Sequence, residues 1–429
     1  MIKQYIIQAL AQLRQHPVIS VVSVVGTALA IFLIMLVVMM QQVKTAPFAP
    51  ESNRDRFLHA KFISIEHEKG GSSNGPLSEQ TAKELYQSLK TPEAVTIYGY
   101  GVTSSYVSLP GQAVTSFDML QTDDTFWQVF NFHFIEGKPY DKATFDASIP
   151  VAVLTETVAR TLFGTTEGIV GKEFLLNHLP YKVCGVVKDV STLATTAYAQ
   201  LWIPYTAGGM NATTWADNLM GMMSCTILAK SHADFPAIRE ETDRRLKEYN
   251  KIIRENHWNI ISRNRPYDQE TQSVTPFANV TANLESHHRQ QFVIFLILLI
   301  VPAINISSMT QSRLRQRVSE IGVRRAFGCT RTALMMQIIA ENFIVTLIAG
   351  AFGLLMSVIF AFVQSHTIFA QSYSLTLNPP EVSISILLQW STFLWAFFFC
   401  FILNLLSSGI PAWKASRTCI VNALNGQSY

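Results

Sequence analysis

The chain has 429 residues, of which 49% are hydrophobic and 15% are charged, and its formal net charge at pH 7 is +3. Residues 41–289 have a net charge of −4, whereas the rest of the chain carries +7. The basic excess therefore lies beside apolar stretches. This excludes a nucleic-acid-binding surface and is typical of segments that flank a membrane.

Four long apolar stretches divide the chain, one before and three after a polar block. They cover residues 18–40, 290–311, 334–364 and 382–410. A helix rises about 1.5 Å per residue, so roughly 20 residues span a hydrocarbon core of about 30 Å. We therefore predict an α-helical membrane protein with four transmembrane helices (1 + 3), which carries a large α+β domain of two subdomains over residues 41–289.

The positions of the basic residues predict the orientation of the four spans. They precede the first span, fill the loop 312–333 and follow the fourth span: Lys3, Arg14, Arg313, Arg315, Arg317, Arg324, Arg325, Arg331, Lys414 and Arg417. The short loop 365–381 contains neither Lys nor Arg. Because positively charged loops stay in the cytoplasm, we place both termini, the loop 312–333 and the tail 411–429 there. The domain and the loop 365–381 then lie outside.

The first 17 residues are expected to form an amphipathic helix. Apolar residues stand at positions 2, 6, 9, 10 and 13, which share one helical face, so this segment should lie along the inner membrane surface. The apolar run that follows is longer than the roughly 7–15 residues of a signal-peptide core. We interpret it as an uncleaved anchor.

The polar block shows two strand–helix–strand patterns separated by an insert. The segment 44–53, which contains Pro47 and Pro50, is expected to be a linker. The first pattern has a strand at 62–66, a helix at 78–90 with Ser78 as its N-cap, and an extended segment at 95–109. The second has a strand at 222–228, a helix at 234–250 and a strand at 258–262.

The insert between the two patterns is rich in predicted strands. It includes a strand at 150–154, a helix at 156–163 and a strand at 181–188. We therefore expect a split α/β, porter-like part, about 45–112 and 216–285, which carries a strand-rich subdomain at about 113–215.

Candidate catalytic and metal-binding residues have simpler explanations. The pairs Asp123–Asp124 and Glu240–Glu241 fit helix capping and a solvated face, and no nucleophile motif is present. Cysteine spacing does not match a metal site, and Cys184 and Cys225 could form a disulfide, although buried free thiols are the commoner case. We expect no catalytic residue, no metal and no enzymatic activity of the chain itself.

The loop 312–333 contains the sharpest motif. Residues 320–328 read Glu-Ile-Gly-Val-Arg-Arg-Ala-Phe-Gly, a basic amphipathic segment that composition alone would interpret as an inner-leaflet lipid anchor. The order of its residues resembles the coupling loop of MacB-type (FtsX-like) ABC permeases. Further segments similar to that family occur in matching order at 124–139, 151–156, 162–164, 169–172, 184–189, 202–204, 304–306, 341–342, 411–417 and 421–424.

The resemblance implies a permease in the bacterial inner (cytoplasmic) membrane with its large domain in the periplasm. A separate cytoplasmic ABC ATPase would bind ATP and Mg, because this sequence has no phosphate-binding loop of its own. The implied docking residues are Ser319, Glu320, Ile321, Gly322, Arg324, Arg325, Ala326, Phe327 and Gly328. Movement of the ATPases would then drive the periplasmic domain without a substrate path through the membrane, which is mechanotransmission. Glu341 is expected to pair with an arginine of this loop.

Small residues predict close helix contacts within the bilayer. Ala349, Gly353 and Ser357 are spaced by four in the third span. A similar stripe in the first span predicts a contact with a second permease copy or a paralogue, in a homo- or heterodimer: Ser23, Gly26, Thr27 and Ala30.

The expected function is export of a periplasmic substrate or extraction of a lipoprotein. A periplasmic adaptor or an outer-membrane component is a further candidate partner, besides the lipid bilayer. Three alternatives stay open: an FtsX-like regulator of a periplasmic cell-wall hydrolase, a peptide-sensing membrane protein and a membrane-tethered enzyme. The size of the domain favours the exporter over the regulator.

Overall fold

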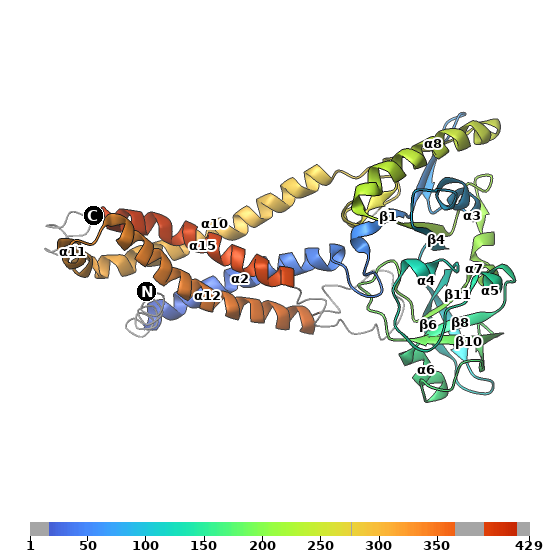
Figure 1. Cartoon of the computed structure of the whole chain (residues 1–429), viewed down its shortest axis with the longest axis horizontal. Coiled ribbons are helices and arrows are strands. Elements are labelled where there is room, and N and C mark those ends of the chain that lie inside the picture. The colour runs from blue at the N-terminus through green and yellow to red at the C-terminus, as the bar shows by residue number, and fades with distance from the viewer. Residues whose placement is uncertain (1–16, 276, 365–389, 418–429) are drawn as a thin grey trace. The chain divides into compact units, whose positions relative to one another are not determined.

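The computed structural model describes residues 17–275, 277–364 and 390–417. The chain divides into two compact units, which we call the helical unit (residues 1–42, 285–368 and 384–429) and the core domain (residues 43–284 and 369–383). Figure 1 shows the helices of the first unit and the mixed strands and helices of the second. The predicted amphipathic helix 1–17, apart from its last residue, and the predicted loop 365–381 lie outside the described residues.

Five helices make up the described part of the helical unit. They are α2 (Pro17–Thr45), α10 (Leu284–Gln316), α11 (Val318–Ala326), α12 (Arg331–Val363) and α15 (Trp390–Ser416). The last three residues of α2 and the first residue of α10 belong to the core domain. Within the described residues, three segments are long and apolar enough to cross a membrane: Val24–Thr45, Arg331–Val363 and Trp390–Ser416. The helix α10 is not among these three, so the count of four spans stays a prediction.

Large apolar side chains of α2 pack against the other helices of the unit. Ile31, Ile34 and Met35 are fully buried and contact a cluster that includes Leu403 of α15. The glycines of α12 allow this close packing, because a Cβ added at Gly353 would lie 2.5 Å from the backbone oxygen of Ala28 in α2. Gly353, one of the small residues predicted to permit close helix contact, therefore does so between two helices of one chain.

The core domain contains one large mixed sheet. Its strand order is β11 (Leu201–Pro204), β8 (Val151–Thr155), β10 (Leu179–Val187), β9 (Glu173–Leu176), β5 (Thr103–Ser108), β6 (Thr115–Thr122), β4 (Ala94–Gly99), β14 (Met223–Leu228), β1 (Phe57–Ala60) and β16 (Tyr267–Asp268). The strand β7 (Phe134–Gly137) pairs with β10. Because β11 also pairs with β6, the six strands from β11 to β6 form a closed circuit.

The other end of this sheet joins segments from both ends of the domain. The strand β14 pairs antiparallel with β1 on one side and with β4 on the other, so residues before 100 and after 222 share hydrogen bonds. A second sheet also joins segments from both ends of the domain. Its strand order is β15 (Trp258–Ile261), β2 (Ile63–His67) and β3 (Ser72–Gly75). A small hairpin pairs β12 (Thr214–Trp215) with β13 (Met220–Gly221).

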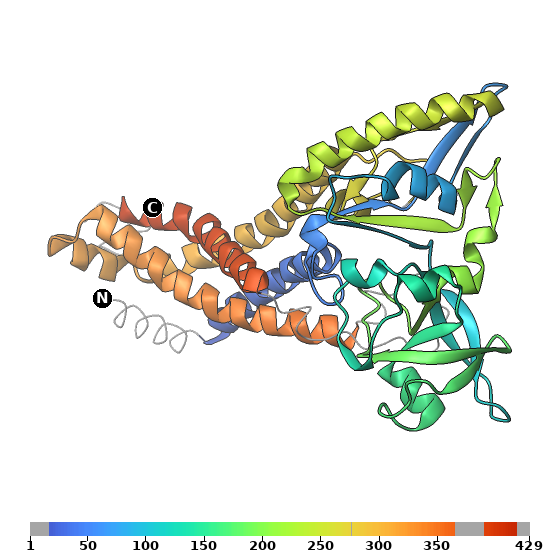
Figure 2. The ribbon, with the colours of Figure 1, turned by 45° about the vertical axis from the view of Figure 1, so that its right-hand side comes forward.

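Helices cover the sheet of the core domain, as Figure 2 shows for the long helix α8 (Phe235–Ile253). Ser78 accepts a hydrogen bond from the Thr81 backbone N–H, which confirms it as the N-cap of α3 (Glu79–Ala82). A π-helical turn, η2 (Lys83–Gln87), continues α3, so the predicted helix 78–90 ends earlier than expected. Leu85 faces the core and is 2% exposed.

The remaining short helices lie on loops or strand ends. They are η1 (Arg54–Arg56), α4 (Phe126–Val129), α5 (Lys142–Asp146), α6 (Glu156–Phe163), α7 (Tyr205–Gly208), η3 (Met210–Ala212), η4 (His232–Asp234), η5 (Arg254–Asn256) and α9 (Gln269–Ser273). The bounds of α6 match the predicted helix 156–163, because Thr155 caps its first turn and Gly164 ends it in the left-handed conformation.

The expected linker at 44–53 is wrong, because this segment is fixed by a buried ion pair. The helix α2 continues to Thr45, and both Glu51 and Arg54 are almost fully buried. Arg54 Nε lies 2.7 Å from a Glu51 carboxylate oxygen, and the Arg54 guanidinium also donates to the backbone oxygens of Val43, at 2.8 Å, and Leu193, at 2.7 Å. The other Glu51 oxygen accepts the backbone N–H groups of residues 196 and 197. We call these contacts the Arg54 cluster.

Candidate functional site

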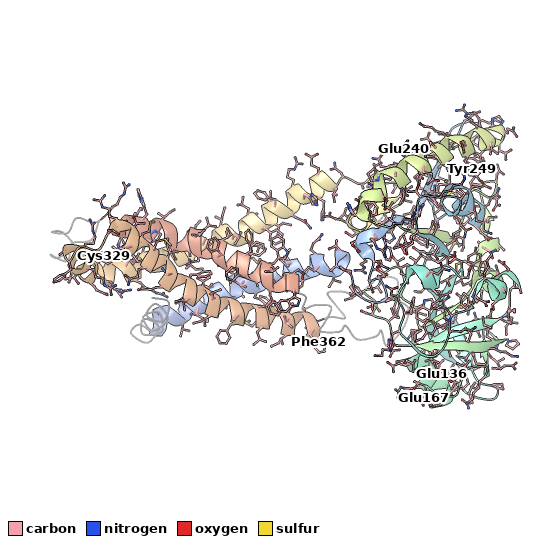
Figure 3. All side chains as sticks on the ribbon, viewed as in Figure 1. Glu136, Glu167, Glu240, Tyr249, Cys329 and Phe362 are labelled. Carbon is pink, nitrogen blue, oxygen red and sulfur yellow. The ribbon has the colours of Figure 1, made fainter. Side chains whose placement is uncertain are left out.

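The helix α11 lies in the predicted coupling loop, between α10 and α12. It begins after Arg317 and ends at Phe327, where Gly328 adopts a φ of +89° that reverses the chain. The Thr330 hydroxyl then accepts the backbone N–H of Ala333 and caps α12. Figure 3 labels the neighbouring Cys329 at the end of the helical unit where these turns lie. A short helix is therefore held between two long ones by defined turns.

One face of α11 is buried in the helical unit. Val318 is 4% exposed, Ile321 is 6% exposed and Gly322 is buried. Their apolar surroundings come from three long helices: Leu314 of α10, Leu334 and Ile338 of α12, and Ala412 and Ala415 of α15. Burial of this face explains why a nine-residue helix is stable here, since isolated helices of that length are marginal in water.

The opposite face of α11 is exposed. Ser319, Val323, Ala326 and Phe327 are separated by four, seven and eight positions, which places them on one side of the helix. Phe327 is 89% exposed and Val323 is 44% exposed. Exposed large apolar side chains beside polar ones are typical of a surface that another protein covers.

An ion-pair network fixes the charged residues of the loop. Glu320 accepts hydrogen bonds from Arg317 at 2.8 Å and from Arg324 at 2.6 Å, and Arg317 holds the pKa of Glu320 below its ordinary value. Arg317 also lies 3.2 Å from the Glu341 carboxylate of α12, which confirms the predicted pairing of Glu341 with a loop arginine. Arg325 donates to the backbone oxygen of Ser416 at the end of α15. Arg317 therefore links the start of α11 to α12, and Arg325 links its end to α15.

The nine predicted coupling residues thus divide into three groups. Ser319, Ala326, Phe327 and Gly328 are exposed, Ile321 and Gly322 are buried, and Glu320, Arg324 and Arg325 are partly buried in the network. The prediction did not include Val323 or Arg317. Helical periodicity from Ser319 to Phe327 would have identified Val323, whereas the role of Arg317 depends on Glu341, which is distant in sequence.

The residues of the predicted dimer contact do not share one environment. Thr27 and Ala30 are 3% and 4% exposed and are buried among helices of the same chain. Gly26 is exposed, and a Cβ there would meet nothing within 4 Å. The side chain of Ser23 lies outside the described part. A dimer contact through α2 stays a proposal that rests on the exposed Gly26 face.

Asp123 and Glu241 of the core domain serve as hydrogen-bond acceptors. Asp123 accepts the backbone N–H groups of Ile97 and Phe126 at 2.8 and 2.9 Å, while Glu241 accepts those of Lys90 and Thr91 at 2.9 and 3.1 Å. Their neighbours in sequence, Asp124 and Glu240, do not complete an acid–base pair with them in the described contacts. Cys184 and Cys225 are both free thiols, which settles the alternative left open by the sequence.

Apolar helices of membrane-spanning length and a large α/β domain together indicate a membrane protein that carries a folded domain. Residues 20–245 match the family model of the MacB-like periplasmic core domain, which covers more than half of the chain. Residues 292–420 match the model of the FtsX-like permease C-terminal domain. The chain therefore belongs to the MacB/FtsX-like family of ABC transporter permeases.

Individual relatives are distant. The macrolide export ATP-binding/permease protein MacB of Escherichia coli (strain K12) is 22% identical over 302 residues, which are 70% of this chain and 42% of that protein. The MacB protein of Shigella boydii serotype 4 (strain Sb227) matches with the same identity and coverage. The chain therefore spans less than half the length of the curated relatives it matches.

Solved structures with some likeness include two outer domains of transporters. The periplasmic region of MacB from Actinobacillus actinomycetemcomitans is 18% identical, covers 52% of this chain and 94% of its own, and has a TM-score of 0.33. The extracellular domain of the noncanonic ABC-type transporter YknZ from Gram-positive bacteria is 12% identical, with coverage of 47% and 100% and a TM-score of 0.32. TM-scores at this level do not establish a shared fold.

Proposed function

We propose that this chain is the permease subunit of an ABC transporter in the bacterial inner membrane and that a separate cytoplasmic ATPase docks on the exposed face of α11. The observation that carries the proposal is the position of Phe327, an almost fully exposed aromatic side chain on a helix whose other face is buried. A rigidly held, apolar projection can transmit force from a partner, whereas a mobile lipid anchor cannot. ATP and Mg would be bound by that partner.

Force from the ATPase would reach the core domain along α2 and α10. Both helices belong to the helical unit for most of their length, while the last three residues of α2 and the first residue of α10 belong to the core domain. The Arg54 cluster supports this route, because it holds the last turn of α2 rigidly within the core domain. The second permease of the complex would be a copy of this chain or a paralogue.

The polar side chains inside the helical unit favour mechanical work over a substrate channel. Asn404 of α15 is 1% exposed, donates to the backbone oxygen of Ile339 and accepts a hydrogen bond from Ser408. Its polar groups are therefore satisfied inside the packed helices rather than facing an aqueous path. We infer that the work is done on a substrate outside the membrane, as export of a periplasmic substrate or extraction of a lipoprotein.

Replacement of Phe327 tests the docking proposal. In Phe327→Asp, the exposed ring is lost and a carboxylate would be buried in the contact, so we expect loss of ATPase co-purification at normal membrane insertion. The readout is the amount of ATPase recovered with tagged permease from solubilised membranes. Wild-type recovery would show that α11 does not carry the contact.

Trp390→Asp provides the matched control. Trp390 is 86% exposed and begins α15, whose opposite end, at Ser416, accepts a hydrogen bond from Arg325 of α11. Its replacement removes a similar exposed aromatic ring and adds the same charge. We expect ATPase recovery to be unchanged, so a loss in both variants would indicate a general insertion defect.

A further inference from the structure

The core domain contains a cavity of about 540 Å³, a volume in the usual range of small-molecule sites. The cavity lies between segments from both parts of the domain. The N- and C-terminal parts contribute Lys61, Phe62, the turn at 98–103, Met222, Gln272 and Thr275, and the insert contributes Leu120, Thr192, Thr195, Thr196, Tyr198 and Met210. The exposed face of α11, on which we propose that the ATPase docks, belongs to the helical unit. The cavity is therefore a separate feature of the molecule.

Lys61 gives the cavity its charge. Among the described residues that line the cavity, it alone carries a formal charge at pH 7, and its ammonium makes no hydrogen bond or ion pair within the described part of the chain. Burial lowers the pKa of Lys61, while nearby Glu51 acts to raise it and Arg54 to lower it. Glu51 and Arg54 are already bound to each other at 2.7 Å, so neither compensates Lys61 directly.

Thr103 also lines the cavity, and its hydroxyl, which lies just behind the cavity surface, is a second unsatisfied group. Its oxygen is buried and has no hydrogen-bond partner among the described residues. Buried polar atoms without partners are uncommon and are generally completed by a water molecule or a ligand. The Lys61 ammonium therefore calls for acceptor oxygens in the cavity, and the Thr103 hydroxyl would reach the same oxygens after rotation of its side chain.

The rest of the lining suits a flat apolar body. The rings of Phe62 and Tyr100 lie 5.3 Å apart between centroids and form one wall, and Leu120, Met210 and Met222 add aliphatic and thioether surface. Methionine side chains adapt to ligands of differing shape. A ligand that matched both the charged end at Lys61 and the apolar wall would carry an anionic group at one end and an apolar ring system at the other.

We propose that this cavity binds a small amphipathic carboxylate, whose carboxylate group pairs with Lys61 and whose apolar body lies against Phe62 and Tyr100. The pairing would offset the cost of a partly buried, unpartnered ammonium. After rotation of the Thr103 side chain toward the cavity, the same oxygens or a second polar group of the ligand would accept a hydrogen bond from its hydroxyl. Binding requires no ATPase, so it is independent of the docking of α11.

Competition for Lys61 tests the site in the full-length protein. Trinitrobenzenesulfonate arylates neutral lysine amines, forming an N–C bond with release of sulfite and a proton, and peptide mass spectrometry quantifies each lysine. We expect 2-naphthoate to protect Lys61 several-fold and 2-naphthamide, which has the same ring without the charge, to protect it little. Lys230, which is exposed in the same domain, should be unaffected by both. Equal protection of Lys61 by the two compounds, or by neither, would overturn the proposal.

Direct titration of 2-naphthoate by calorimetry gives a second measurement. Lys61→Met keeps the apolar stem of the side chain and removes the charge, so binding should weaken at least about tenfold. Lys61→Arg keeps the charge and should bind within a few-fold of wild type. Unchanged affinity in Lys61→Met, with thermal unfolding as in wild type, would show that any binding does not involve Lys61.

Discussion

Arg54 shows how much depends on a single buried side chain. It is 1% exposed, and its guanidinium bonds to the Glu51 carboxylate, to the end of α2 and to the backbone near residue 193. It also lies over the Phe48 ring, 4.2 Å from the centroid. Removal of one partner of such a pair leaves a buried charge without compensation, which is far more costly than loss of a surface pair.

We therefore expect Arg54→Ala to reduce the stability of the core domain by about 3–5 kcal/mol. For a domain of this size, each kcal/mol lowers the unfolding midpoint by roughly 2–4 °C, which thermal unfolding followed by circular dichroism would detect. Arg56→Ala is the control, because Arg56 pairs with Glu93 at 2.9 Å while the two side chains stay 26% and 50% exposed. That change should cost less than about 1 kcal/mol. Equal losses in the two variants would contradict the role given to the Arg54 cluster.

The contact between α2 and α12 illustrates packing at the scale of elements. Gly353 lets the two helices approach so closely that an added Cβ would meet the Ala28 backbone oxygen and the Ile31 side chain, the latter at 3.0 Å. We expect Gly353→Ala to separate the helices and destabilise the helical unit by about 1–3 kcal/mol, measured as a lower unfolding midpoint in detergent.

Gly409→Ala in α15 is the matched control for this prediction. A Cβ at Gly409 would meet nothing within 4 Å. Since alanine has a higher helix propensity than glycine, this variant should be as stable as wild type or slightly more stable. If Gly353→Ala proved equally harmless, α2 and α12 would not be in the close contact described here.

Sequence patterns predicted elements well where the signals were local. The N-cap Ser78 and the helix α6 followed from capping residues and spacing, and the strands β2, β8, β10, β14 and β15 from alternating or β-branched runs. The linker prediction failed because it rested on Pro47 and Pro50, which are visible in the sequence. The backbone N–H groups that hold Glu51 lie about 145 residues away and could not be foreseen. Long-range burial of that kind leaves no periodic pattern.

The proposed docking face of α11 was predictable only in part, for the same reason. Residue order identified the segment 319–328, but the inward or outward direction of each side chain depends on packing against α10, α12 and α15. The family resemblance implied that Arg324 and Arg325 contact the ATPase. In the structure they bond within the chain, to Glu320 and Ser416, so their replacement would disturb α11 itself.

At the scale of the whole molecule, transmission of force requires a stiff connection between the two units. Insertion of Gly-Ser-Gly-Ser between Thr45 and Ala46 would separate α2 from the Arg54 cluster while leaving the chain continuous. We expect this variant to lose transport activity but to retain ATP hydrolysis by the complex, because a flexible tether transmits no directed push. Both activities would be measured in reconstituted vesicles or in cells that depend on the transporter.

The same insertion between Gly70 and Gly71 is the control. Both glycines are exposed in the same domain and have φ angles of +93° and +103°, so this turn should accept extra residues. Transport and ATP hydrolysis should both persist. Normal transport after insertion at Thr45 would argue against mechanical coupling through α2.

The Arg54 cluster also has a consequence for the order of biogenesis. Arg54 emerges from the ribosome early, but its acceptor at Leu193 follows 139 residues later. At roughly 5–20 residues per second, the newly made segment waits on the order of ten to thirty seconds before its final partner exists. During that interval the first helix can insert and settle in the bilayer while its outer end is still unclamped. Once the insert has been translocated, Arg54 can bond to Leu193 and fix the outer end of α2. Membrane insertion therefore precedes completion of the core domain.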